Sequence, residues 1–525
     1  MSGRLDRYVR HLTTFAVGKV ANAAIQAALI AMLVRHLGAE GYGVWVIAFS
    51  LGSYMGLVDL NTNAAVVKYT AELLATGRRA ELAPMVNAGV QILFAFSFGL
   101  LVLVLPALPW LVPLIFKTTA YAARDLELLS GLCLLSFAVL QTGNVYTQTL
   151  QGLLRQDEVN AIAVLGALVN ALAAALVLWR GMDIAWLGVA SLCGNAALLL
   201  VTRWRVRRLA PELPWLPFRS TPAWRASLLH FSAGSYAFTL WGWFYFTVPQ
   251  LFLAVELGPV WVAYFDIATR LGSQGRNMVQ TLSQYLIPFM SESAAREGSE
   301  RVHAQQVQAL TFIWMVGLGI GGYLFAVRAP LIAVWLHKSD PAQLFAIMWG
   351  MVEYTAGGLA MPWVHFALAE GRLRHARPFL TYIIPACVLG PLLGLALGPR
   401  LAAAFPDFLP WFKLPGGGDN ARFAGFLMGG ALANCAGTAL FYALAVGDRG
   451  LDARALAFRL GRVALGFVLG LLVLALVPWN PSLPALVLAG LLWSAVLALS
   501  WLAFGLYDRE LAGRLLGKFG FGGAS

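Results

Sequence analysis

Apolar runs of about 20 residues recur along the whole chain, separated by short polar connectors. A helix of that length spans the hydrocarbon core of a bilayer, which is about 30 Å thick. We therefore predict an all-α polytopic membrane protein with about 14 transmembrane helices. The predicted spans are 12–34, 44–66, 85–107, 125–150, 157–179, 184–203, 227–254, 259–290, 307–327, 342–369, 378–398, 421–446, 460–477 and 484–506.

The distribution of basic residues predicts the orientation of these spans. An even number of spans places both termini on one side, and the loops and termini on that side hold 25 of the 37 Lys and Arg residues, against nine on the other. Because Lys and Arg accumulate in cytoplasmic loops, we expect both termini to be cytoplasmic. The basic loops then face anionic membrane lipids, so the net charge of +12 does not predict a nucleic-acid partner.

Composition and motifs argue against an enzyme. Charged residues make up 12% of the chain, about half the share found in an average soluble domain. The sequence has no P-loop, nucleophile elbow, HExxH or dinucleotide-binding motif. We predict no catalytic residues, cofactor or metal. The four cysteines lie in predicted spans without the spacing of metal ligands: Cys133, Cys193, Cys387 and Cys435.

A weak internal repeat suggests two halves of six spans each. Three pairs of landmarks recur at nearly the same offset and the same place in the helix order. They are His11 and His230, Leu37 and Leu257, and Pro113 and Pro330. Parallel halves of this kind occur in transporters, with the substrate site at their interface. We predict an N-lobe (1–208), a basic cytoplasmic linker (209–226), a C-lobe (227–446) and a final pair of helices with a tail (447–525).

The eighth predicted span carries a continuous polar stripe. Residues that are three or four positions apart lie on the same face of a helix. One such face is polar over five turns, and Arg276 flanks it. Its residues are Asp266, Arg270, Ser273, Asn277, Gln280 and Gln284. Intramembrane charges are by default a functional hypothesis, and the stripe predicts a helix wall that faces a water-filled cavity. In an alternative interpretation, Asp266 and Arg270 form a structural pair that neutralises itself.

Further polar positions extend this pattern. Lys19, Asn22 and Gln26 share a face of the first span, and Gln141 and Asn144 lie in the fourth. Asn and Gln in membranes also simply bond one helix to another, so both interpretations stay open. With Lys19, Arg270 and Arg276 opposite a single Asp266, we expect an anionic guest. Isolated acids in the second and tenth spans are positions for ion coupling: Asp59 and Glu353.

Two segments resemble a known family. "LVRHLGAEGYGVWVIAFSLGSYMGLVDLNTNAAVVKYTAELLATG" (33–77) and "LGPVWVAYFDIATRLGSQGRNMVQTLSQYLIPFMSESAAREG" (257–298) are similar to regions of Wzx-type polysaccharide flippases, in the multidrug/oligosaccharidyl-lipid/polysaccharide exporter superfamily. The resemblance implies two six-helix lobes around a central cavity in the bacterial inner membrane. By alternating access the protein would move an oligosaccharide linked to undecaprenyl diphosphate or a similar lipid to the periplasmic leaflet. It would serve synthesis of a surface polysaccharide such as O-antigen, beside other assembly proteins.

The resemblance also implies roles for single residues. In the related lipid II flippases, cations on the first and eighth helices engage the diphosphate. The matching positions here are Lys19 and Arg270, and less directly Arg276. The last two helices of those relatives form a groove for the lipid tail, which corresponds to 460–506. Many family members carry an Asp late in the seventh helix, where this chain has Gln250, so a role tied to that acid is not carried over.

Two other functions remain as alternatives. A cation-coupled multidrug exporter of the same superfamily would need an acidic or aromatic cavity, and the basic balance of the spans argues against one. A membrane glycan polymerase or ligase would need a large periplasmic loop for its catalytic residues. The longest predicted periplasmic loop (399–422) is short and mostly apolar.

Overall fold

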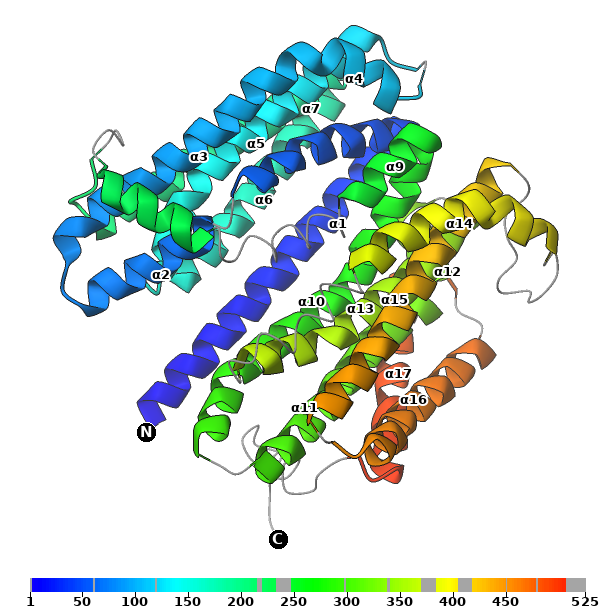
Figure 1. The fold of residues 1–525 in the computed structure, drawn as a ribbon. Helices are drawn as coiled ribbons and strands as arrows, with labels where there is room; N and C mark the ends of the chain where they lie inside the picture. The colour runs from blue at the N-terminus through cyan, green and yellow to red at the C-terminus, as the bar shows by residue number, and fades with distance from the viewer. Residues whose placement is uncertain are drawn as a thin grey trace. The chain divides into compact units, whose positions relative to one another are not determined.

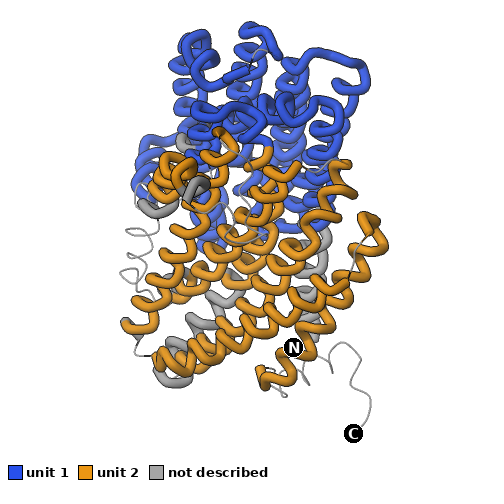
Figure 2. The backbone as a smooth tube through the Cα atoms, turned by 90° about the vertical axis from the view of Figure 1, so that its right-hand side faces the viewer, with its two compact units in different colours: residues 1–263 blue, residues 264–525 orange. Residues whose placement is uncertain are grey.

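The computed structural model is helical, with no strand among the residues it describes. These residues are 2–59, 62–118, 120–214, 220–232, 247–296, 299–337, 340–369, 384–404, 418–449, 451–477 and 480–506. The chain forms two compact units, residues 1–263 and residues 264–525 (Figure 2). The predicted boundary between the linker and the C-lobe falls close to residues 215–219 and 233–246, which lie outside the described part. The lobe and linker boundaries therefore stay a prediction.

Unit 1 is built around α5, which packs against α1, α2, α3 and α7 (Figure 1). Its α-helices are α1 (Ser2–Ser53), α2 (Thr62–Ala75), α3 (Leu82–Val104), α4 (Leu108–Ile115), α5 (Ala123–Gly152), α6 (Gln156–Trp179), α7 (Ala185–Leu209), α9 (Val248–Glu256) and the start of α10 (Pro259–Arg296). Three 3₁₀ turns join helices in the part of this unit that the structure describes: η1 (Tyr54–Asp59), η2 (Arg79–Glu81) and η3 (Leu105–Ala107). The core includes Leu213 and Leu228, so the segment after α7 folds onto this unit.

The first two predicted spans differ from the helices observed. Gly38 has φ 71° and ψ −179° and breaks α1 into two segments, which is a conformation that glycine adopts without steric cost. The second segment ends at Ser53, and η1 separates it from α2, so the predicted span 44–66 is not one continuous helix. A side chain at Gly43 would overlap the carbonyl group of Pro259. The second segment therefore meets the start of α10 with backbone against backbone.

In its described residues, unit 2 contains most of α10 and seven further helices (Figure 1). They are α11 (Ser299–Ala326), α12 (Arg328–Leu336), α13 (Pro341–Ala369), α14 (Ile384–Ala404), α15 (Asp419–Arg449), α16 (Ala453–Leu476) and α17 (Leu483–Ala503). The helix α13 packs against α11 and α15, while α16 packs against α11 and α17. A methyl group on Gly394 of α14 would overlap the carbonyl oxygen of Gly425 on α15, so these helices also touch through their backbones.

Helix length and exposure fit a bilayer. Ten helices in the described part are long and apolar enough to cross a membrane. On α7, Trp186 and Trp204 are both exposed, and 18 positions of helix separate them by roughly 27 Å. Tryptophan favours the two membrane interfaces, and this spacing is close to the hydrocarbon thickness of about 30 Å. The protein is a multi-pass membrane protein.

Candidate functional sites in the transmembrane helices

An ion pair on α10 combines a buried acid with a partly exposed base. The Nε of Arg270 donates to Oδ2 of Asp266, one turn earlier, at 2.6 Å. The Asp266 side chain is 6% exposed and that of Arg270 is 36% exposed. Burial of an unpaired carboxylate would be costly, so the pair stabilises Asp266. It also fixes the guanidinium of Arg270, while part of that group remains accessible.

The polar residues of α10, in the stripe and beside it, differ in how far they are exposed. Gln274 and Asn277 are exposed, whereas Ser283 is buried and donates to the backbone carbonyl of Val279. The amide of Gln274 donates to the carbonyl oxygen of Arg270 at 3.1 Å. Gln280 is half-buried, and the side chain of Gln284 lies outside the described residues. Arg270, Gln274 and Asn277 are thus among the accessible polar groups in the middle of α10.

Arg276 differs from Arg270 in its surroundings. Its guanidinium carbon lies 5.5 Å from the ring centre of Tyr354 on α13. A methyl group on Gly358 of α13 would come within 3.1 Å of the Cα and Cγ of Arg276, so the glycine makes room for this crossing. Arg276 therefore packs against α13, and its aromatic contact holds the cation by attraction to the ring face.

Glu353 lies in a buried polar contact between α13 and α15. It is 9% exposed, and Asn434 donates from Nδ2 to its Oε1 at 3.3 Å. The same amide nitrogen lies 3.2 Å from the carbonyl oxygen of Gly430. Sequence reasoning missed Asn434, although an amide at position 434 of an otherwise apolar span was a visible signal.

The polar residues predicted in unit 1 mostly bond within the unit. Asn144 donates to Gln141 at 2.8 Å along α5. Asp59 accepts a hydrogen bond from the backbone N–H of Asn63 and so caps the start of α2. Ser50 donates to Gln250 at 2.5 Å and joins α1 to α9. Only the contact of Ser50 with Gln250 joins two helices, so both interpretations of Gln141 and Asn144 stay open.

The polar face of the first span is less fully described. Asn22 and Gln26 are both half-buried on α1, before the break at Gly38. The side chain of Lys19 lies outside the described residues. Its predicted role in binding an anion therefore stays a prediction.

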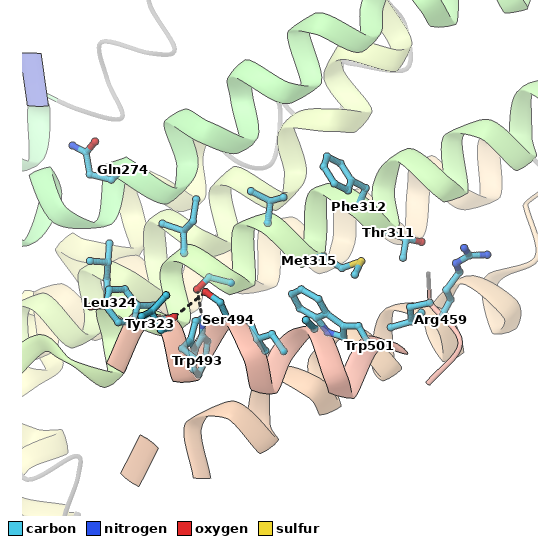
Figure 3. A pocket seen from close by; sticks show the side chains of 18 of the residues that line it. Gln274, Thr311, Phe312, Met315, Tyr323, Leu324, Arg459, Trp493, Ser494 and Trp501 are labelled. Carbon is cyan, nitrogen blue, oxygen red and sulfur yellow. Dashed lines mark hydrogen bonds between the residues drawn. The ribbon is translucent and has the colours of Figure 1, made fainter. Parts of the chain in front are cut away.

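Unit 2 contains an elongated cavity of about 870 Å³ beside α11, α16 and α17 (Figure 3). On α11 its lining extends from Gln308 to Leu324, a rise of roughly 24 Å. Most of the wall is apolar, with Phe312, Met315 and Leu497 among its members. Gln274 of α10 also lines it, one turn from Arg270. The cavity therefore adjoins the accessible polar segment of α10.

Comparison with known proteins identifies the fold. No protein-family model and no curated protein matches the sequence. A lipid II flippase structure, MurJ in an inward closed conformation, matches with TM-score 0.68 and 10% identity, over 93% of this chain and 98% of that one. An inward-facing multidrug resistance MATE family transporter of the MOP superfamily matches with TM-score 0.62 and 13% identity, over 82% and 94%. This chain has the MurJ/MATE fold.

A third match agrees with that assignment. A MOP superfamily transporter from Pyrococcus furiosus aligns with TM-score 0.51 and 13% identity, over 82% of this chain and 96% of that one. The MurJ/MATE fold confirms the predicted helical membrane architecture. The structural neighbours named here are a lipid II flippase and two transporters.

Proposed function

We propose that this protein is a flippase for an isoprenoid-diphosphate-linked oligosaccharide, which it moves by alternating access from the cytoplasmic to the periplasmic leaflet of the bacterial inner membrane. The transported lipid would serve assembly of a cell-surface polysaccharide. The observation that supports this most is the arrangement at α10. A partly exposed Arg270, held by Asp266, is one turn from Gln274, which lines an apolar cavity of about 870 Å³.

The two parts of that arrangement suit the two parts of such a substrate. The planar guanidinium of Arg270 makes forked hydrogen bonds to phosphate oxygens, which replace the water that a diphosphate loses in the membrane. Gln274 and Asn277 offer amides for sugar hydroxyls. The cavity beside α16 and α17, at the predicted tail-groove helices, offers an apolar surface for the lipid chain. With the predicted orientation, an inside-negative potential favours outward movement of each negative charge by about 2.3 kcal/mol per 100 mV.

A cation-coupled exporter remains the second candidate because Glu353 is a buried carboxylate in a fold shared with MATE transporters. Of the two acids predicted for ion coupling, Asp59 caps a helix, so Glu353 is the stronger site. Ion coupling through Glu353 is also compatible with a flippase. No observation favours a polymerase or ligase.

Translocation of a lipid-linked oligosaccharide by purified protein in liposomes tests the proposal. We expect Arg270→Ala to reduce the rate by about tenfold or more, since hydrogen bonds to charged groups contribute strongly. Lys19→Ala should also impair transport while leaving membrane insertion intact. Arg422→Ala is the matched control, because Arg422 also pairs with an acid, Asp419, and is similarly half-buried, but lies near the start of α15 and away from the polar stripe of α10.

Two results would contradict the proposal. If each of the variants Arg270→Ala and Lys19→Ala fully restores polysaccharide synthesis when it is expressed in a deletion strain, the prediction that these residues bind an anion is wrong. If deletion changes drug sensitivity without accumulation of lipid-linked sugar, the exporter is the better assignment.

A further inference from the structure

The elongated cavity has a single charged residue in its described lining, Arg459 of α16. In Figure 3 its guanidinium rises from α16 at the same end of the cavity as Thr311 and Trp501. The Nε of Arg459 is buried and has no hydrogen-bond partner among the described residues. Arg462, one turn further along α16, differs because it donates to the carbonyl oxygen of Phe504 at 3.1 Å and lies over the Phe458 ring.

The hydroxyl and indole groups of the wall are already bonded to backbone carbonyl oxygens. Trp493 donates to Gly319 at 2.7 Å and Tyr323 donates to Leu486 at 2.6 Å. Similar bonds are made by Thr311, Ser494 and Trp501. These groups therefore present mainly hydrocarbon to the cavity. The half-buried Arg459 is confined to the end at which α16 begins, and a buried donor such as its Nε is unfavourable without an acceptor.

This asymmetry selects a ligand with a long apolar body and an anionic head. We propose that Arg459 binds the phosphate head of a single-chain polyisoprenyl phosphate or diphosphate whose hydrocarbon lies along α11 and α17 in the cavity. Arginine suits phosphate because its donors form a planar fork. The choice of an isoprenoid over a two-chain phospholipid rests on the proposed function.

The position of Arg459 gives this site a role distinct from that of Arg270. With the predicted orientation, α16 begins on the cytoplasmic side, so Arg459 holds the head in the leaflet from which transport starts. The cavity then leads along α11 toward Gln274 and the polar segment of α10. Arg459 is thus a loading site, and Arg270 acts in the later passage of the head.

Native mass spectrometry of the full-length protein, released from detergent with added lipid, tests the site. The probes are a C55 polyprenyl phosphate, the uncharged C55 polyprenol and phosphatidylglycerol. We expect Arg459→Gln to lower retention of the polyprenyl phosphate by about tenfold, and to leave retention of polyprenol unchanged. The control is Arg454→Gln, on the same helix but exposed and outside the cavity lining, which should bind all three lipids like the unmodified protein.

A second variant tests the chain-binding part independently of the charge. Gly319 faces the cavity, and the nearest side-chain atoms to a methyl group there belong to Leu497 and Trp501 at 3.6 and 3.9 Å. Gly319→Leu should therefore fill the space and lower retention of both polyprenyl phosphate and polyprenol. Equal binding of polyprenyl phosphate by Arg459→Gln and unmodified protein would overturn the proposal. Phosphatidylglycerol that competes equally would overturn the assignment to a single-chain lipid.

Failure of the proposed function gives a different pattern. If the protein does not transport lipid-linked oligosaccharide, the liposome assay fails for the unmodified protein, whereas Arg459-dependent retention of polyprenyl phosphate still occurs. Conversely, Arg270→Ala should lose transport and keep this retention, because Arg270 does not line the cavity.

Discussion

Arg270 and Asp266 lie one turn apart on α10 with Nε and Oδ2 2.6 Å apart, and only the arginine is substantially exposed. The acid thus acts as a positioning residue for the cation. We predict that Asp266→Asn reduces translocation less than Arg270→Ala does. In a double-mutant cycle measured by liposome transport, Asp266→Asn should have little further effect once Arg270 is alanine. Additive losses would show that Asp266 acts through another group.

Charge alone should not replace the guanidinium. Lysine at position 270 keeps the positive charge but loses the forked geometry for phosphate. We expect Arg270→Lys to transport lipid-linked oligosaccharide at a rate between those of Arg270→Ala and the unmodified protein. A rate equal to that of the unmodified protein would mean that Arg270 provides only electrostatic attraction.

Two substitutions at the contact between Glu353 and Asn434 test separately whether it stabilises the fold and whether Glu353 couples transport to an ion. Asn434→Leu removes the amide that donates to Glu353, and an unsatisfied buried group costs about 1–3 kcal/mol, so thermal unfolding in detergent should occur at a lower temperature. Glu353→Gln keeps a hydrogen-bonding oxygen and should fold. If an ion is coupled at this site, transport by Glu353→Gln loses its dependence on an imposed proton or sodium gradient, whereas an unchanged dependence excludes Glu353.

The crossing of α14 and α15 should not tolerate a side chain. In Gly394→Ala the new methyl group overlaps the backbone of Gly425, and overpacking typically costs about 1–3 kcal/mol or more. Gly447→Ala on α15 is the control, because nothing lies within 4 Å of a methyl group there. The fraction of monodisperse protein after heating measures the difference. Equal thermal stability of the two variants would contradict the close contact.

Orientation can be tested at the two ends of α7. A cysteine in place of Met182, just before α7, should react with a membrane-impermeant maleimide in intact cells. A cysteine in place of Arg208 should react only after the inner membrane is opened. Both positions are exposed, and the native Cys193 would be replaced by serine in both. The reverse labelling pattern would invert the predicted topology.

Sequence periodicity predicted the helices and the polar side of α10, because three- and four-residue spacing defines a helix face. It placed Arg276 beside the stripe and ranked it below Arg270, but it did not predict the contact of Arg276 with α13, since that contact depends on tertiary packing. For the same reason it did not predict Asn434 as the partner of Glu353. The division of the predicted span 44–66 also escaped detection, because its residues are apolar enough to continue a helix and η1 interrupts them.

The contact between α14 and α15 has a mechanical consequence. Where Gly394 and Gly425 meet, carbonyl groups face backbone atoms directly, and no side chains lie between them that can change rotamer. Sliding of packed helices usually proceeds through small side-chain rearrangements at the contact. The two helices must therefore move together as one rigid pair. Any deformation within unit 2 then occurs where side chains fill the space between helices, as between α11 and the α16–α17 pair.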